Sequence, residues 1–537
     1  MDLRDVNSIG ALLDAVATPH ASRTALLHRD RRVTYGELRD ESLRAARGLA
    51  ALGVVKGTHV GLLLPNSPDW LFLAFGALRL GAVLVPLNTL STPRELAHAL
   101  YHADVHVLVM VARFLRHAYL DTVVELCPGL RAASSPRGLE SPEFPTLRHV
   151  VVTERDALPP GVRALATVLE GYGAVPAALV TAATRQCGPA DRGAIFFTSG
   201  STALPKGVVH THGSMLASAE NIRDTLGLTA DDVTWGYLPF FFTGGFVAIA
   251  MASIAAGASV VLQETFDAGE TVRLLESTGC TVLFGWPHQI QAIIEHPSFD
   301  RARLKIHKGV GANAAWAAAM YPDNHRAVGT YGMTESGPMS VASRWNDRPE
   351  IRAGCHGRPL PGVELRIADP ESGAVRGPGE EGEILLRGAT MMESYYKTPR
   401  EECFDRDGFF HTGDRGRLDQ EGLLHFLGRL KDVIKTAGVN VAAGEIEAVL
   451  RQHPGVREAY VVGVPHPTRG ENPAAFVIRS GEADAEELLA FCRERLASYK
   501  VPRHIFFRQE HELPAAGSGK VLKQRLQEEA VALVGTA

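Results

Sequence analysis

The chain has 537 residues, with 55 lysines and arginines against 60 aspartates and glutamates and a formal net charge of −5. This balance excludes a nucleic-acid-binding protein that relies on bulk positive charge, because neutralising phosphates needs clustered cations. Hydrophobic residues make up 45% of the chain and charged residues 21%. Wholesale disorder is therefore excluded, and large hydrophobic cores are expected.

The first part of the chain alternates short apolar runs with helical patterns. Thr34 and Glu37 have the spacing of a capping box at the start of a helix. Residues 59–65 are typical of a strand, 69–80 of a helix and 82–87 of a second strand, which is the order of a βαβ unit in a parallel sheet. Further strands are expected at residues 105–110 and 148–153.

The stretch 235–263 contains no charged residue and is long enough to be considered as a membrane span. Pro239, Gly244, Gly245 and Gly257 interrupt it, however, and divide it into a strand, a helix and a second strand. We therefore expect a buried strand–helix–strand unit in a soluble protein without a membrane span.

Residues 194–207, A-I-F-F-T-S-G-S-T-A-L-P-K-G, contain the strongest candidate site. An apolar strand leads into hydroxyl side chains, a flexible backbone and a lysine, a combination that suits phosphate oxygens. It is not a Walker A loop, because Pro205 precedes Lys206, and an ordinary polar turn is the alternative. The candidate phosphate contacts are Thr198, Ser199, Gly200, Ser201, Thr202 and Lys206.

After about residue 428 the pattern becomes that of a compact α+β unit. We predict an α/β fold with a large N-terminal domain of parallel-rich sheets and flanking helices, residues 1–428, and a small α+β C-terminal domain, residues 429–537. The six cysteines are far apart and the N-terminus lacks an apolar stretch, so no disulfide framework or secretory signal is expected. These features predict a cytoplasmic location.

The segment 194–207 resembles the phosphate loop of the adenylate-forming superfamily, which includes acyl-CoA synthetases, aryl-CoA ligases, carrier-loading adenylation domains and beetle luciferases. Four more motifs follow in family order, so the resemblance covers nearly the whole chain. They are Y-G-M-T-E-S at 331–336, D-G-F-F-H-T-G-D at 407–414, G-R-L-K-D-V-I-K-T-A-G-V-N-V-A-A-G-E-I-E at 428–447 and L-P-A-A-G-S-G-K-V-L-K at 513–523.

The resemblance implies roles for residues in the nucleotide motifs. Tyr331, followed by Gly332, packs on the adenine of ATP, Thr334 touches the α-phosphate, and Glu335 binds Mg²⁺. Asp414 holds the ribose hydroxyls and Arg429 adds a second ribose contact. Lys520 reaches the substrate carboxylate and the α-phosphate, so the implied catalytic residues are Lys520, Thr198 and Glu335.

The resemblance also implies that the C-terminal domain is mobile and rotates between two half-reactions. Lys431 corresponds to the family's hinge residue. Rotation withdraws Lys520 and brings a loop with Lys435, Ala437 and Gly438 to the site, where the pantetheine arm of coenzyme A passes.

Two departures from the family pattern bear on substrates. Ala203 replaces a glycine of the phosphate loop, and Phe242 replaces a frequent histidine. An apolar wall beside Gly244 and Gly245, whose missing side chains are expected to leave open volume, favours a bulky or elongated hydrophobic acid. The expected pocket residues are Phe242, Gly244, Gly245, Trp286, Val310 and Met339, the alternative being that the aromatic residues are simply core.

The leading hypothesis is an ATP-dependent carboxylic acid–CoA ligase that uses Mg²⁺ and forms an acyl-adenylate. A free-standing adenylation enzyme that loads a carrier protein is the alternative within enzymes; few residues follow Lys523, so no fused carrier domain is expected. A luciferase-type oxygenase is less favoured, and a nucleotide-binding regulatory protein is the alternative outside enzymes. Expected partners are a small carboxylic acid, ATP and coenzyme A, with the chain a monomer or a homodimer.

Overall fold

The computed structural model describes residues 2–132, 138–154, 158–198, 205–312, 314, 316–321, 326–436, 439–466, 470–496, 500–515 and 521–535. These residues cluster into two compact units. The first holds the described residues up to Glu364 together with Leu386–Phe409, and the second holds Leu365–Leu385 and the described residues from Phe410 onward. The predicted domain boundary at residue 428 stays a prediction.

The first unit contains a mixed sheet with the strand order β20-β9-β8-β4-β3-β5-β6-β7. The predicted βαβ unit is confirmed, since β3 and β4 pair in parallel on either side of α3, Pro68–Arg79. The strands are β3 His59–Leu63, β4 Val83–Pro86, β5 Val107–Met110, β6 His149–Val152, β7 Val162–Ala164, β8 Arg192–Thr198, β9 Lys206–Thr211 and β20 Ser394–Tyr395.

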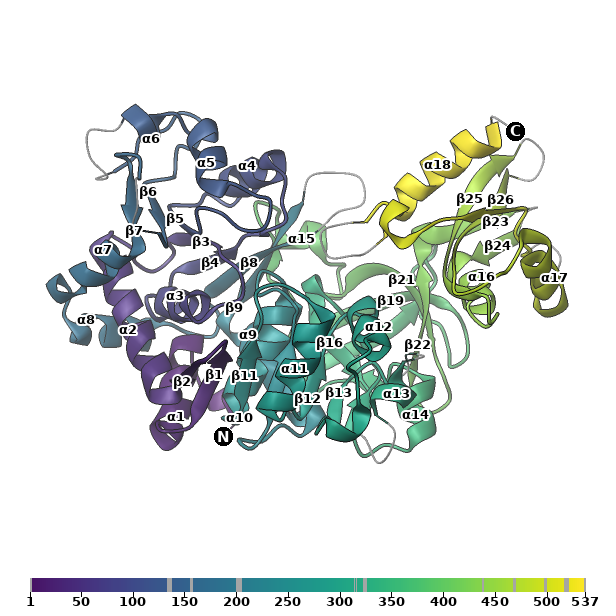
Figure 1. Cartoon of the computed structure of the whole chain (residues 1–537), viewed down its shortest axis with the longest axis horizontal. Helices are drawn as coiled ribbons and strands as arrows, with labels where there is room; N and C mark the ends of the chain where they lie inside the picture. Colours follow the sequence, from purple (N-terminus) through teal and green to yellow (C-terminus); the bar gives the residue numbers. More distant parts are fainter. Residues whose placement is uncertain are drawn as a thin grey trace. The chain divides into compact units, whose positions relative to one another are not determined.

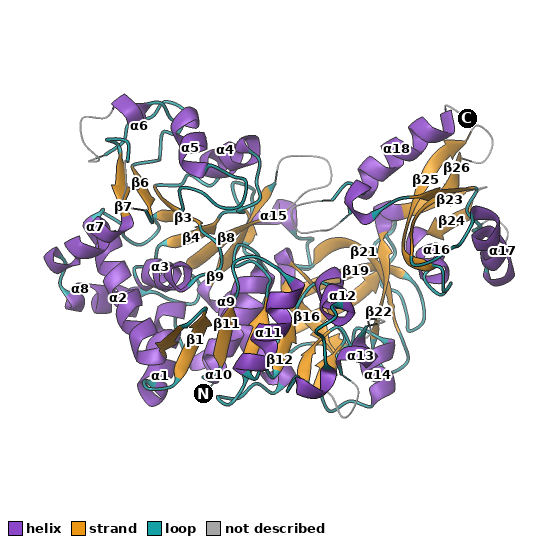
Figure 2. Cartoon of the chain, in the orientation of Figure 1, coloured by secondary structure: helices purple, strands orange, loops and turns teal. Residues whose placement is uncertain are grey.

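Helices cover both faces of this sheet (Figures 1 and 2). Alternate residues of β5 show why: Val107 and Val109 pack into one apolar core, while Leu108 and Met110 pack into another. A strand that is buried on both faces reads as a continuous apolar run rather than an alternating one. The first core lies under α2 Tyr35–Ala51, α3, α7 Leu165–Glu170 and α8 Ala177–Gln186, and the second under α4 Pro93–His102, α5 Tyr119–Leu126 and α6 Gly129–Ala132.

The helix α2 begins as the sequence predicts. The Thr34 hydroxyl accepts a hydrogen bond from the Glu37 N–H at 3.1 Å, and the Glu37 carboxylate accepts one from the Thr34 N–H at 2.7 Å. This capping box satisfies backbone donors that the first helical turn leaves open.

A second sheet of the first unit has the order β14-β13-β12-β10-β11-β1-β2 and is parallel except for β2. Its strands are β1 Thr24–His28, β2 Arg31–Thr34, β10 Val233–Gly236, β11 Ser259–Leu262, β12 Val282–Phe284, β13 Lys308–Val310 and β14 Arg326–Val328. The helices of the first unit that have not yet been named are α1 Ile9–His20, α9 His212–Leu226, α10 Ala252–Ala256, α11 Ala268–Thr278, α12 Pro287–Glu295, α13 Ala317–Met320, α14 Pro349–Gly354 and α15 Arg400–Cys403.

The uncharged stretch 235–263 forms the predicted buried unit. Strands β10 and β11 pair in parallel, and between them Gly244–Met251 is a π-helix that continues into α10. Within the described ranges no single helix has the length and apolarity to cross a membrane, although the bent pair Leu165–Ala174 and Ala177–Gln186 meets both criteria when taken together.

A small antiparallel sheet, β15-β16-β17, completes the first unit, with strands β15 Thr330–Met333, β16 Gly337–Ala342 and β17 Arg358–Pro359. The second unit carries most of the sheet β18-β19-β21-β22 and a further sheet with the order β24-β23-β26-β25, in which β27 pairs with β26. The strands are β18 Val363–Ala368, β19 Gly382–Gly388, β21 Phe410–Leu418, β22 Leu424–Arg429, β23 Val433–Thr436, β24 Val439–Ala442, β25 Val456–His466, β26 Gly470–Arg479 and β27 His504–Phe507.

The predicted α+β pattern of the C-terminal residues is confirmed. Helices α16 Ala443–Leu450 and α17 Ala485–Arg495 pack into one apolar core, and α18 Lys523–Gly535 packs into another. Neighbouring residues of β26 pack into different cores, since Ala475 belongs to the first core and Phe476 to the second. The sheet is therefore covered on both faces.

Candidate functional site

The candidate phosphate loop connects two paired strands. Thr198 ends β8 and lies opposite Lys206, which begins the antiparallel strand β9. Ser199, Gly200, Ser201, Thr202 and Ala203 lie outside the described residues, so the loop is defined here by its two ends. Beside it, the His98 Nε2–H donates to the carbonyl of Pro205 at 2.9 Å, which fixes the backbone immediately before Lys206.

The second motif begins on β15 and ends in a 3₁₀ turn, Thr334–Ser336. Tyr331 is 7% exposed and lies opposite Val341 of β16. At Gly332 a side chain is excluded, since a Cβ atom there would lie 2.7 Å from the carbonyl oxygen of Pro338. Thr334 and Glu335 therefore lie in the turn that follows the strand carrying Tyr331, the candidate adenine-stacking residue.

A buried histidine joins this turn to β9. The His210 Nε2–H donates to the carbonyl of Thr334 at 2.7 Å, and Nδ1 lies 3.0 Å from the Ser214 hydroxyl. Burial lowers the pKa of His210 from 6.5 to about 4, so the ring is neutral at physiological pH and carries its proton on Nε2. No motif included His210.

Tyr395 is a further residue that sequence reasoning missed. Its hydroxyl donates to Glu335 Oε1 at 2.9 Å, and the Lys206 Nζ lies 4.7 Å from the centre of its ring. Lys206 and Glu335, which belong to separate motifs, therefore both contact the side chain of Tyr395. The sequence contains no signal for this contact beyond the Y-Y pair at residues 395 and 396.

Asp414 of the third motif and Arg429 of the fourth lie opposite each other on β21 and β22 of the second unit. The Arg429 Nε lies 2.8 Å from Asp414 Oδ1, and Asp414 is 3% exposed. A buried carboxylate needs such a partner, because burial without one is costly. The guanidinium also orients this carboxylate, and both groups suit hydroxyl ligands.

Several predicted residues of the second unit are only partly described or not described. Lys520, Ala437 and Gly438 lie outside the described residues. Lys431 lies in the 3₁₀ turn Leu430–Asp432, and Lys435 lies in β23. For these two lysines the structure describes the backbone alone.

Lys523 is the last residue of the motif at 513–523, and the resemblance assigned it no role. Its Nζ lies 2.6 Å from Glu447 Oε1 and 3.7 Å from Asp432 Oδ2. Since Asp432 belongs to the hinge motif and Lys523 begins α18, these ion pairs tie the end of the lysine loop to the hinge turn within the second unit.

The candidate acyl pocket is partly assembled. The rings of Phe242 and Trp286 lie 6.0 Å apart at 72°, an edge-to-face arrangement. Met339 is buried on β16, which packs against the π-helix that begins at Gly244, and Val310 packs against the same apolar core as Met339.

The expectation that Gly245 leaves open volume is wrong. A Cβ atom on Gly245 would lie 2.2 Å from the carbonyl oxygen of Pro239 and 2.5 Å from that of Leu238. Its missing side chain therefore permits a close approach of backbone rather than a pocket. Gly244 differs, because a Cβ atom there meets only the Leu238 Cδ1, at 3.3 Å.

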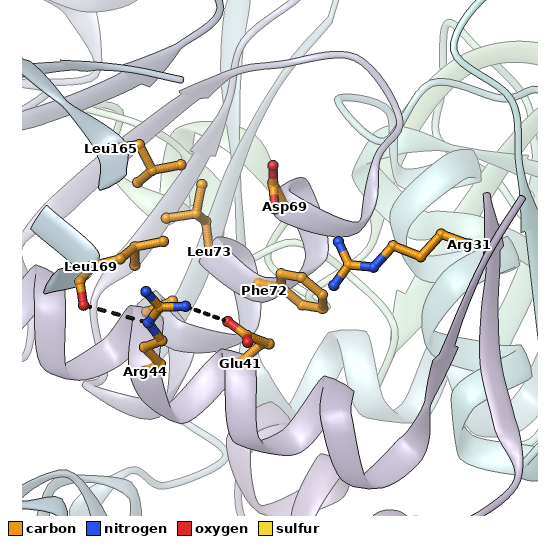
Figure 3. A pocket seen from close by; sticks show the side chains of 9 residues that line it. Arg31, Glu41, Arg44, Asp69, Phe72, Leu73, Leu165 and Leu169 are labelled. Carbon is orange, nitrogen blue, oxygen red and sulfur yellow. Dashed lines mark hydrogen bonds and ion pairs between the residues drawn. The ribbon is translucent and has the colours of Figure 1, made fainter. Parts of the chain in front are cut away.

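A hollow of about 170 Å³ lies elsewhere in the first unit, beside α2, α3 and α7 (Figure 3). Within it the Arg44 guanidinium donates to Glu41 and to the carbonyl of Leu169. Its lining residues are Arg31, Glu41, Arg44, Ala45, Asp69, Phe72, Leu73, Leu165 and Leu169. Since none of the motif residues lines it, this hollow is separate from the candidate site.

Sequence comparison identifies the class of protein. The model of the AMP-binding enzyme family matches residues 13–396, and the model of the AMP-binding enzyme C-terminal domain matches residues 445–520. The chain belongs to the AMP-binding enzyme family, which confirms the resemblance to adenylate-forming enzymes drawn from the motifs.

Individual relatives are acid–CoA ligases. A 3-(7a-methyl-1,5-dioxo-octahydro-1H-inden-4-yl)propanoyl:CoA ligase of Mycobacterium tuberculosis is 34% identical over 546 residues, covering 98% of this chain and 99% of the relative. A feruloyl-CoA synthase of an Amycolatopsis species is 34% identical over 516 residues, covering 94% of this chain and 95% of the relative. The crystal structure of the anthranilate CoA ligase AuaEII with anthranoyl-AMP matches with a TM-score of 0.84 and 26% identity, each chain being covered completely (100%).

Proposed function

We propose that the chain is an ATP-dependent carboxylic acid–CoA ligase that works through an acyl-adenylate. The family membership and the relatives support this activity. The structural observation that carries the proposal is that Lys206 and Glu335 both contact Tyr395. This contact supports a site in which Lys206 is proposed to bind phosphate and Glu335 is proposed to bind Mg²⁺.

The proposed reaction has two steps. In the first, a carboxylate oxygen of the acid attacks the α-phosphorus of ATP, and the bond to the β-phosphate oxygen breaks, so that pyrophosphate leaves. In the second, the sulfur of coenzyme A, after losing its proton, attacks the carbonyl carbon of the adenylate, and AMP leaves. Both steps develop negative charge on phosphate or carbonyl oxygens, which positioned cations and N–H donors stabilise.

The motif residues would bind and orient the nucleotide. Tyr331 would pack on adenine, next to Gly332, where a close backbone contact leaves no room for a side chain. Thr334 would contact the α-phosphate from a turn that His210 anchors. The residues proposed to bind the phosphates are Thr198, Ser199, Gly200, Ser201, Thr202 and Lys206, and those proposed to bind ribose are Asp414 and Arg429.

Glu335 fits a magnesium ion bound together with ATP. Mg²⁺ prefers oxygen ligands and is commonly held by one or two carboxylates with substrate phosphates. The hydrogen bond from Tyr395 orients the Glu335 carboxylate. Among the described residues no cluster of three or more His, Cys, Asp or Glu is placed to hold a metal ion. When bound, the ion would neutralise charge on phosphate oxygens.

We propose a bulky or elongated hydrophobic acid as the substrate. The edge-to-face pair of Phe242 and Trp286 gives the proposed pocket an aromatic wall. Gly245 is excluded from the pocket by its backbone contacts, so Gly244 is the glycine that we retain in the proposed pocket, since an added Cβ there meets only a side-chain methyl group. The bicyclic and aromatic acids in the names of the relatives support this class.

Coenzyme A is the proposed acceptor, and a carrier protein is the alternative. Relatives named as CoA ligases support the former. All six cysteines are free, and most are buried, which agrees with a reducing compartment and with the proposed cytoplasmic location. The hinge at Lys431, the CoA loop with Lys435, Ala437 and Gly438, and a monomeric or homodimeric state stay predictions.

Lys520 provides the sharpest test of the mechanism. Lys520→Ala should lower the rate of acyl-adenylate formation by ~10² or more, about 3 kcal/mol of transition-state stabilisation. Given synthetic acyl-adenylate, the variant should still form thioester at close to the wild-type rate. Lys305→Ala, which removes an exposed lysine of the first unit, should leave both rates unchanged. An equal loss in both half-reactions would contradict the role proposed for Lys520.

A further inference from the structure

The segment 392–396 is fixed by main-chain hydrogen bonds to both halves of the candidate nucleotide site. The Met392 N–H donates to the carbonyl of Glu335 at 2.8 Å, and the Tyr396 N–H donates to the carbonyl of Gly207 at 2.7 Å. Between them, Tyr395 lies opposite Val208 in the antiparallel pairing of β20 with β9. The backbone of Tyr395 is therefore held against the turn that carries Glu335 and the strand that Lys206 begins.

The side chain of Tyr395 then contacts both charged groups. Its hydroxyl donates to Glu335 Oε1 at 2.9 Å. The Lys206 Nζ lies 4.7 Å from the ring centre, within the range of about 6 Å at which an ammonium group is attracted to an aromatic face.

Both contacts leave the charges intact. A phenol hydroxyl is a neutral donor to the carboxylate, and an aromatic face is a neutral partner for the ammonium group. A direct ion pair between Lys206 and Glu335 would instead direct each charge toward the other. Tyr395 thus holds a cation and an anion near each other while both can still interact with a further ligand.

We propose that Tyr395 is a positioning residue that sets the placement of Lys206 relative to Glu335, and so couples binding of the triphosphate to binding of its magnesium ion. This inference rests on the proposed function, since it assigns ATP and Mg²⁺ to these two groups. Tyr395 acts through Lys206 and Glu335 and does not itself take part in the chemistry.

The test is direct binding of a non-hydrolysable ATP analogue to the full chain, measured by calorimetry with Mg²⁺ and again with EDTA. Tyr395→Phe keeps the ring and removes the hydroxyl, so the affinity in Mg²⁺ should fall about tenfold, as expected for the loss of a hydrogen bond to a charged group. The affinity in EDTA should stay within about twofold, because the ring still supports Lys206. Tyr395→Leu should weaken binding in both conditions.

The neighbouring residue offers a matched control. The Tyr396 hydroxyl donates to Asp104 Oδ2 at 2.8 Å, so Tyr396→Phe removes the same atom from the same segment without touching Lys206 or Glu335. This variant should bind the analogue as the wild type does, with and without Mg²⁺.

The outcomes separate the inference from the function on which it rests. If the wild type does not bind the analogue, the proposed function fails. If the wild type binds and Tyr395→Phe retains full affinity in Mg²⁺, loses affinity equally in Mg²⁺ and EDTA, or behaves like Tyr396→Phe, the role of Tyr395 is refuted while the proposed function stands.

Discussion

Gly245 and Gly244 are adjacent glycines for which the structure predicts very different losses of stability when the same methyl group is added. In Gly245→Ala the new Cβ would lie 2.2 Å from the carbonyl oxygen of Pro239 and 2.5 Å from that of Leu238. Both neighbours are backbone atoms, so the chain itself must move to relieve the contact. Overpacking of this kind costs about 1–3 kcal/mol, and two backbone contacts place the expected loss near 3 kcal/mol.

In Gly244→Ala the methyl group meets only the Leu238 Cδ1, at 3.3 Å. A terminal methyl group of a side chain can shift by a few tenths of an ångström, so the free energy of unfolding should change by less than about 0.5 kcal/mol. Urea unfolding of the full chain, followed by circular dichroism, measures both. A lower midpoint of the first transition is expected for Gly245→Ala alone, and equal midpoints for the two variants would refute this reasoning.

A larger substitution at Gly244 tests the acyl pocket once the stability of the variants is known. Gly244→Leu adds four carbon atoms, on the order of 100 Å³, at the position where an added Cβ meets a side-chain methyl group rather than backbone. Bulky acids should then lose several kcal/mol of transition-state binding, while two- to four-carbon acids lose little. The KM for ATP should change far less than the KM for the acid. An unchanged preference between small and bulky acids would place the pocket elsewhere.

Two further predictions concern the hinge and the buried histidines. Lys431→Pro should fix the backbone at the hinge, so that adenylate forms and accumulates in single-turnover assays with little CoA ester; normal overall turnover would contradict domain rotation. Burial lowers the pKa of His210 and of His212, the buried first residue of α9, to about 4, whereas the histidines of the unfolded chain take up protons near pH 6.5. Stability should therefore fall as the pH drops from about 6.5 to about 4, by up to ~3 kcal/mol for each histidine. His210→Gln should flatten this dependence in urea unfolding at pH 7, 5.5 and 4.5, and an unchanged slope would exclude His210 as a source.

Local patterns predicted much of the fold because they report local physics. The βαβ unit at residues 59–87 was legible from alternating apolar runs, and the capping box at Thr34 from spacing alone. For Gly244–Met251 the sequence predicts a helix, and the structure shows that it is a π-helix. The residue pattern does not distinguish the wider turn of a π-helix over so short a stretch.

The site shows where such reasoning stops. Asp414 and Arg429 came from motifs, and the structure pairs them. Tyr395 contacts Lys206 and Glu335 through a strand pairing between segments far apart in sequence, and no local pattern encodes that contact. A glycine leaves room in one setting and permits close backbone approach in another, so Gly245 could be assigned only after its neighbours were placed.

The central claim is that this chain activates a carboxylic acid with ATP and transfers it to coenzyme A. The most direct measurement is pyrophosphate release over a panel of aromatic, polycyclic, medium-chain and long-chain acids, with thioester formation followed in parallel using free coenzyme A and a pantetheinylated carrier protein. We predict acid-dependent pyrophosphate release for at least one bulky hydrophobic acid and an equal amount of its CoA thioester. Release without thioester on coenzyme A but with transfer to the carrier, or no release with any acid, would contradict the account.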